Sequence, residues 1–230
     1  MNEQFFKNLR LKYYQEKNAQ LQPRDIDGLI HASSLGGCTK KLWYKVTYAE
    51  VRKNISPELY DTFNHGHAVH DWRQGMHKEV LKNNPKYTFL DELKTSDQKY
   101  GGGIDPMIVG STDGLLIDNE TGLRYIYELK TMAEKSWDRL RSPQQKHILQ
   151  GNIYAKAFGA EGVLFEYYNK NKDKSKEYYV EFDPGAIDAA MSQLNYVFSH
   201  LEKGEEPRPD PSYFECKSCP YYHLCRPEDS

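Results

Sequence analysis

Apolar residues recur at helical spacing in three long stretches of the chain. The first predicts an N-terminal helix whose apolar face carries Phe5, Phe6, Leu9 and Tyr13. The second predicts a helix over 57–80, with apolar positions at Leu59, Phe63, Val69, Trp72 and Met76. The third predicts a last helix that starts at Asp183-Pro184 and has apolar positions at Ile187, Ala190, Met191, Leu194, Val197, Phe198 and Leu201.

Two shorter helices are indicated by other signals. A helical segment is expected to run from Ser33 through Cys38 to Trp43. A further helix is expected between a capping-box pattern and a terminating glycine, marked by Ser142, Pro143, Gln145 and Gly159.

Four runs of apolar and alternating residues predict strands, over 107–117, 123–130, 163–168 and 178–182. Turn-forming residues at 119–122 join the first two strands into a hairpin, and the lysine-rich run at 170–176 predicts a solvated loop. In chain order the elements are helices, antiparallel strands, a helix, two strands and a helix. This order indicates a single α/β domain with a mixed central sheet.

The hairpin brings charged residues together if its turn fixes the register. If Asp118 pairs with Leu123, counting back places Asp113 opposite Glu128. Residues that face each other across such a ladder have Cβ atoms about 4.5–5.5 Å apart. Lys130 lies two residues beyond Glu128 and therefore shares its face of the sheet. A slip of one residue would destroy this arrangement.

Composition bounds the class of protein. The 230 residues suffice for one domain, and 38% hydrophobic with 28% charged residues is typical of an ordered, soluble chain. The net charge of -2 excludes a uniformly basic nucleic-acid coat but not a local basic groove. We see no signal peptide and no apolar run of membrane-spanning length, so we expect a cytoplasmic protein without membrane contact.

The cysteines have the placement of metal ligands. Cys38 stands alone, whereas Cys216, Cys219 and Cys225 form a Cys-x2-Cys-x5-Cys cluster. A gap of two residues lets two sulfurs face one ion, and cytoplasmic thiols usually stay reduced. Four thiolates suit zinc as well as an iron–sulfur cluster, and free structural cysteines are a third reading.

The hairpin residues suit a hard divalent cation. Phosphodiester hydrolysis builds negative charge on the phosphate and on the leaving oxygen, and carboxylates bind Mg²⁺ or Mn²⁺. Asp113 and Glu128 offer two carboxylates, and the carbonyl of Leu129 offers a further oxygen. Lys130 could orient a water molecule or offset charge. The simpler alternative is an ion pair on a solvated sheet face.

Several motifs occur together in a recognisable order. Gly-x-x-Asp at 110–113 followed by Glu-x-Lys at 128–130 resembles the core of the PD-(D/E)XK nucleases, with Thr112 in place of the usual proline. Gly66-x-x-x-His70 and Gln150-x-x-x-Tyr154 resemble motifs of the RecB-like branch. With the cysteine pattern, the chain resembles the iron–sulfur subset of that branch from about Ser33 to Cys225. That subset includes the CRISPR-associated "Cas-four" exonucleases and the AddB nuclease domain.

The resemblance implies a fold and a set of roles. It implies one restriction-endonuclease-like domain with a helical part at 1–80, a nuclease core at 85–205 and a cysteine strap at 206–230. A [4Fe-4S] cluster on the four cysteines would tie the two ends, with Zn²⁺ as the alternative. His70 would join Asp113, Glu128 and Leu129 around Mg²⁺ or Mn²⁺, while His65, His67 and His77 are read as ordinary histidines. Gln150 and Tyr154 would position Lys130 or contact DNA.

The function implied by the resemblance is that of a metal-dependent DNA exonuclease, acting 5′→3′ on single-stranded ends. It would serve DNA recombination and repair, phage DNA processing or CRISPR adaptation. DNA would be its partner, together with recombination, helicase or CRISPR adaptation proteins. The alternatives are an endonuclease, or a non-catalytic DNA-binding or scaffolding protein on a nuclease fold.

Overall fold

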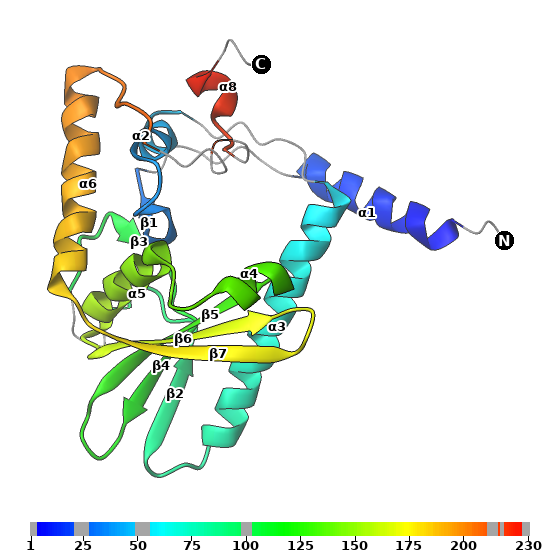
Figure 1. Cartoon of the computed structure of the whole chain (residues 1–230), viewed down its shortest axis with the longest axis vertical. Coiled ribbons are helices and arrows are strands. Elements are labelled where there is room, and N and C mark those ends of the chain that lie inside the picture. Colours follow the sequence, from blue (N-terminus) through cyan, green and yellow to red (C-terminus); the bar gives the residue numbers. More distant parts are fainter. Residues whose placement is uncertain are drawn as a thin grey trace.

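A mixed five-stranded sheet forms the centre of the computed structural model, which describes residues 4–20, 28–48, 56–97, 103–210, 216 and 219–226 (Figure 1). The strand order is β2-β4-β5-β6-β7, and the only parallel pair among these strands is β5 with β6. The strands are β2 (Tyr87–Asp91), β4 (Gly114–Asp118), β5 (Arg124–Met132), β6 (Gly162–Asn169) and β7 (Lys174–Glu181). The expected α/β architecture with a mixed sheet is therefore confirmed.

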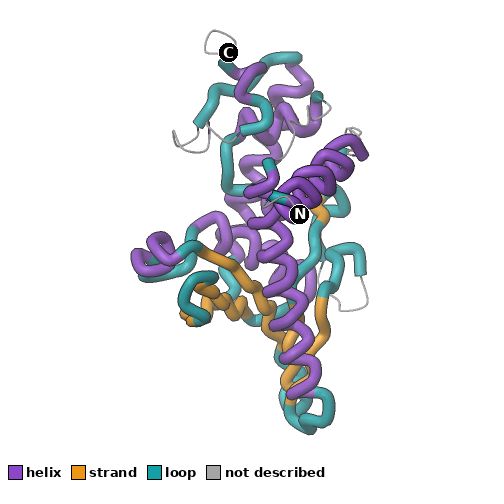
Figure 2. The backbone as a smooth tube through the Cα atoms, turned by 90° about the vertical axis from the view of Figure 1, so that its right-hand side faces the viewer, coloured by secondary structure: helices purple, strands orange, loops and turns teal. Residues whose placement is uncertain are grey.

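Helices cover both faces of the sheet. α3 (Pro57–Leu81) packs on the face that carries Tyr127 and Leu129, and Figure 2 shows this long helix running past the strands. α5 (Gln145–Phe158) packs on the opposite face beneath α6 (Pro184–Lys203). α5 also lies within the crossover that the parallel β5–β6 pair requires.

The predicted hairpin register is confirmed. Gly114 pairs with Tyr127 and Ile117 with Arg124, and the Asp118 N–H donates to the Leu123 carbonyl at 2.9 Å. Gly122 adopts φ of +75°, the left-handed backbone that this turn needs. Counting one residue beyond the ladder places Asp113 opposite Glu128.

The single strand expected over 107–117 is wrong. Residues Ile108–Val109 form β3, which pairs in parallel with β1 (Ile30–His31) in a separate two-stranded sheet. Between β3 and β4 the chain bonds to the segment after β2, with Thr95 N–H donating to Gly110 O and Thr112 N–H to Leu93 O. β4 therefore begins only at Gly114.

The expected helix start at Ser142 is also wrong. α5 begins at Gln145 with Gln144 as its N-cap, and no side-chain cap bond is formed. The Gln144 N–H instead donates to the hydroxyl of Tyr167 on β6 at 3.1 Å. The predicted stop at Gly159 is confirmed, since that residue caps the helix with φ of +59°.

The N-terminal region differs from expectation in two ways. α1 (Phe5–Gln20) forms, but Phe5, Phe6, Leu9 and Tyr13 are exposed, and Tyr14 is the buried residue of this helix. The segment expected to be helical from Ser33 to Trp43 splits into a 3₁₀ turn, η1 (Ala32–Ser34), and α2 (Thr39–Thr47).

Two further helices lie among the described residues. α4 (Glu134–Arg139), which the sequence did not predict, follows β5, and α8 (Tyr222–Cys225) lies near the carboxyl end. Part of the predicted strap at 206–230 lies outside the described residues. Its first residues are held to α2, since Asp210 accepts from the Thr39 N–H at 2.8 Å and Lys40 pairs with Glu206 at 2.7 Å. Within the described ranges, no helix combines the length and apolar character needed to cross a membrane.

Replacing Gly162 by alanine is expected to destabilise the sheet by about 2–3 kcal/mol. A Cβ at Gly162 would collide with the Val180 carbonyl oxygen and the Tyr179 ring, and neither the β6 nor the β7 backbone can yield cheaply. Urea unfolding measures the effect. Gly75→Ala, on an exposed part of α3 with no atom near its Cβ, is the control, and we expect it to stabilise by about 0.5–1 kcal/mol. Equal stability of the two variants would contradict this packing.

Candidate active site

Four polar side chains, from α3, from β5 and from the turn before β4, meet where β4 begins. Asp113 directly precedes β4, Glu128 and Lys130 lie on β5, and His70 reaches over from α3. The Asp113 carboxylate contacts His70 Nδ1 at 3.0 Å through one oxygen and accepts from the Leu129 N–H at 2.7 Å through the other. Lys130 Nζ lies 2.6 Å from Glu128 Oε2, which confirms that these two residues share a face of the sheet.

The turn that presents Asp113 is held from both sides. Thr112 is buried, and its hydroxyl lies within hydrogen-bond distance of the carbonyl oxygens of Gly114 and Tyr127, at 3.0 and 3.2 Å. Threonine therefore does here what proline could not, because proline has no hydroxyl to tie the turn to β5.

Gln74 is a residue of this site that the sequence analysis missed. Its side-chain amide is buried and donates to the backbone carbonyl of Asp113 at 2.9 Å. The signal was available, because Gln74 lies four residues after His70 and therefore on the same face of α3.

A chain of hydrogen bonds leads from Lys130 to α5. Lys130 Nζ donates to Gln150 Oε1 at 3.2 Å, and Gln150 Nε2 donates to the Tyr154 hydroxyl at 3.2 Å. Tyr154 is itself fixed by a close approach to Gly110, where an added Cβ would lie 2.6 Å from its hydroxyl oxygen. The structure thus brings the predicted supporting residue Gln150 to the ammonium group of Lys130, and Tyr154 to Gln150.

Burial and charge perturb the ionisation of these groups. Burial raises the pKa of Glu128, and the Asp113 carboxylate raises it further against the opposing effect of Lys130. Burial alone would lower the pKa of Lys130, but the carboxylates of Glu128 and Asp113 outweigh it and the pKa is raised. For His70, burial lowers the pKa, yet the hydrogen bond to Asp113 leaves it raised. Lys130 is therefore an ammonium group at neutral pH.

The donor set matches a hard divalent cation in its chemistry. Glu128 is 1% exposed, and its Oε1 is a buried oxygen with no hydrogen-bond partner. Burying such an oxygen costs free energy of folding unless a cation or a hydrogen-bond donor compensates it. Across the described part of the chain, no three His, Cys, Asp or Glu side chains are placed as a ready ligand set. Asp113 and His70 contact each other directly, and Glu128 is paired with Lys130.

The other histidines of α3 lie away from this cluster. His65 and His67 are exposed. His77 packs its ring against Phe89 and Tyr127, with centroids 5.4 and 4.9 Å apart, and burial lowers its pKa. These contacts are those of a histidine within an aromatic core.

The four cysteines line one cavity of about 510 Å³. Cys38 is the N-cap of α2, Cys225 ends α8, and the Cys219 N–H donates to the Cys216 carbonyl at 3.0 Å. All four thiols are free and partly buried, and burial raises the pKa of Cys38 and of Cys219. Cysteines from two distant parts of the sequence therefore border a common space, and no three of these described thiols are placed as a ready ligand set.

The fold and the site together define a mixed α/β protein with a carboxylate–lysine cluster at the start of a central hairpin. No protein-family model matches the chain. A segment of 48 residues is 33% identical to "Probable dimethyl sulfoxide reductase chain YnfF" of Escherichia coli (strain K12), which covers 21% of this chain and 6% of that protein. The chain thus spans only a small fraction of the length of that relative.

Solved structures share the fold at low sequence identity. The protein in "Crystal structure of SSO0001" aligns with a TM-score of 0.58 at 19% identity, covering 96% of this chain and 95% of that one. An alkaline exonuclease, LHK-Exo from Laribacter hongkongensis, aligns over 84% of this chain and 93% of its own at a TM-score of 0.46 and 11% identity. LHK-Exo in complex with dAMP aligns with a TM-score of 0.48 at 13% identity, covering 84% of this chain and 94% of that one. The likeness to SSO0001 extends over the fold of nearly the whole chain.

Proposed function

We propose that this protein is a metal-dependent DNA nuclease. The observation that carries the proposal is the meeting of Asp113, Glu128 and Lys130 at one point of the hairpin, with a buried Glu128 oxygen that has no hydrogen-bond partner. A protein that only binds DNA has no need for a buried, unsatisfied carboxylate beside an ammonium group, because both are costly to bury. This favours an enzyme over a scaffold.

Asp113, Glu128 and His70 would hold Mg²⁺ or Mn²⁺, with the Leu129 carbonyl as a fourth ligand. When bound, the cation would supply positive charge for the phosphate and for the leaving oxygen. Lys130 is protonated, so its role is to donate hydrogen bonds to the attacking water or to the phosphate oxygens. Gln150 and Tyr154 fix the direction of the Lys130 ammonium through their side-chain hydrogen bonds.

The finer assignment is an exonuclease that acts 5′→3′ on single-stranded DNA ends. This assignment is proposed from the motifs that resemble the RecB-like branch. The same motifs are the basis for proposing that the protein acts in recombination, repair, phage DNA processing or CRISPR adaptation. A [4Fe-4S] cluster on Cys38, Cys216, Cys219 and Cys225 is proposed with it, because the four thiols line a single cavity. Zinc is the alternative occupant.

The test combines cleavage with thermal stability in matched proteins. We expect the wild-type protein to degrade end-labelled single-stranded DNA with Mg²⁺ or Mn²⁺, and not with EDTA. Mn²⁺ is also expected to raise its Tm, because a ligand that binds only the folded state stabilises it. Asp113→Asn should lose cleavage and most of the Tm increase, since it removes one of the charges that would hold the cation. DNA left intact with both metals, together with the same Tm increase in Asp113→Asn, would reject the proposal.

A further inference from the structure

A second cavity, of about 410 Å³, adjoins the candidate active site and has two lysines in its lining. In the part of the chain that the structure describes, its lining includes two lysines, two histidines and no carboxylate: His70, Leu129, Lys130, Thr131, Met132, Gln144, Lys146 and His147. The whole chain carries a formal net charge of -2, so this concentration of positive side chains is local. The amino end of α5 lies at the same place and adds the positive end of its dipole. The cavity therefore favours an anion.

His147 is fixed so that it presents a hydrogen-bond donor. The buried hydroxyl of Tyr167 accepts from the Gln144 N–H at 3.1 Å, and His147 Nδ1 lies 2.9 Å from the same oxygen. Because the Tyr167 oxygen already accepts the Gln144 N–H, we assign the second contact to the Tyr167 O–H donating to His147 Nδ1, which places the imidazole proton on Nε2. Burial, with the charges of Lys130 and Lys146, lowers the pKa of His147 to about 3. His147 is thus a neutral donor at physiological pH.

Lys146 connects this cavity to the cysteine-lined one. Its side chain is exposed and lines both cavities. Among the described residues no carboxylate lines the cysteine cavity either, and its cationic residues are Lys40, which pairs with Glu206, and Lys41, Lys45, Lys146 and Arg226. A basic surface therefore continues from Lys130 across the first turn of α5 toward the cysteines.

We propose that Lys146 and His147 bind the phosphodiester backbone of a single DNA strand, at a phosphate next to the one that Lys130 faces. The strand then continues over the first turn of α5 toward the cysteine-lined cavity. Lys146 contributes a charge and His147 a neutral N–H, so the pair holds the strand in register with Lys130. The assignment rests on the proposed nuclease function and adds to it the path of the substrate.

Substitutions of Lys146 and of His147 are expected to change the salt dependence of DNA binding differently. Binding of a fluorescein-labelled oligothymidine is measured by anisotropy in EDTA, where no cleavage occurs, at several salt concentrations. Lys146→Ala is expected to weaken binding about tenfold and to lower the slope of log Kd against log salt by about 0.7, because one phosphate contact no longer releases a counterion. His147→Ala is expected to weaken binding by a similar factor with the slope unchanged, since a neutral donor releases none. Lys146→Arg should keep the wild-type slope.

Lys156→Ala is the matched control, because Lys156 is an exposed lysine at the other end of α5, beside Glu161 and Glu181. We expect it to bind DNA as the wild type does. If the wild type binds and cleaves DNA while Lys146→Ala and His147→Ala match it in Kd and slope, the proposed path is wrong and the nuclease assignment stands. A wild-type protein that neither cleaves nor binds DNA would overturn both.

Discussion

Glu128→Gln is expected to reduce metal-dependent cleavage by about 10³-fold or more while the protein stays folded. Glutamine has nearly the same volume and can still accept a hydrogen bond from Lys130, so the packing of this buried side chain is preserved. It cannot supply the negative charge that a divalent cation requires. The rate of digestion of end-labelled DNA, with circular dichroism as the check on folding, measures the effect.

Glu120→Gln is the matched control for this prediction. Glu120 is exposed in the turn at the far end of the same hairpin, and its charge lies away from the Asp113 cluster. We expect this variant to cleave DNA at the wild-type rate. Wild-type cleavage by Glu128→Gln itself would mean that Glu128 holds no catalytic cation.

Cys219→Ser is expected to lose the proposed cluster and to lower the Tm by about 10 °C or more, equivalent to about 3–5 kcal/mol. The four cysteines come from both ends of the chain, so a shared cluster would close a loop around the core and contribute binding energy to folding. The measurements are iron and sulfide content, absorbance near about 400 nm after anaerobic purification, and thermal unfolding.

Ser33→Ala is the control, because Ser33 lines the same cavity without a thiol. We expect wild-type iron content and Tm for this variant. Zinc in place of iron, in a colourless wild-type protein, would select the zinc alternative. Unchanged metal content and Tm in Cys219→Ser would show that the cysteines are ordinary structural residues.

The hairpin could be predicted because its information is local. A four-residue turn sets the register, the period of two assigns each side chain to a face, and the positions of Asp113, Glu128 and Lys130 follow by counting. The α6 prediction held for a similar reason, since Asp183 caps the helix and the apolar spacing places Ala190, Leu194 and Val197 in the core.

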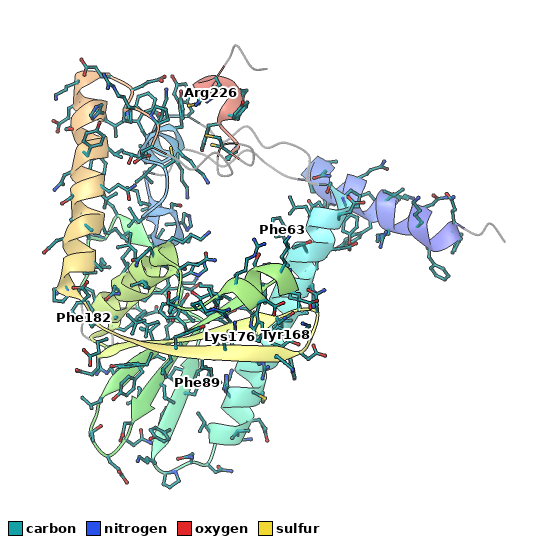
Figure 3. The ribbon with its side chains drawn as sticks, in the orientation of Figure 1. Phe63, Phe89, Tyr168, Lys176, Phe182 and Arg226 are labelled. Atoms are coloured by element: carbon teal, nitrogen blue, oxygen red, sulfur yellow. The ribbon has the colours of Figure 1, made fainter. Side chains whose placement is uncertain are left out.

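The errors arose where a distant segment supplies the hydrogen-bond partner. Lys176, which Figure 3 labels, was expected in a loop but lies in β7. Its ammonium group donates to the carbonyls of Trp137 in α4 and of Leu140 just after it, at 2.8 and 2.9 Å. The start of α5 is likewise decided by Tyr167, which is far away in sequence. No local sequence pattern indicates such partners. Where they exist, their hydrogen bonds override the secondary-structure propensity of the residues.

The apolar face of α1 shows a different limit. Helical spacing identified the helix, but all four apolar residues predicted for its buried face are exposed, and only Tyr14 is buried among the residues described for it. Periodicity indicates which side chains share a face of a helix. It does not indicate whether another element covers that face.

The close approach of Gly110 to Tyr154 gives position 110 an importance that its chemistry would not suggest. A methyl group there would compete with the tyrosine hydroxyl for the same volume. Displacing the hydroxyl would release Gln150, and with it one of the two partners that aim the Lys130 ammonium. The requirement at this position is for empty space, so a residue without a side chain constrains the position of the Lys130 ammonium group through Tyr154 and Gln150.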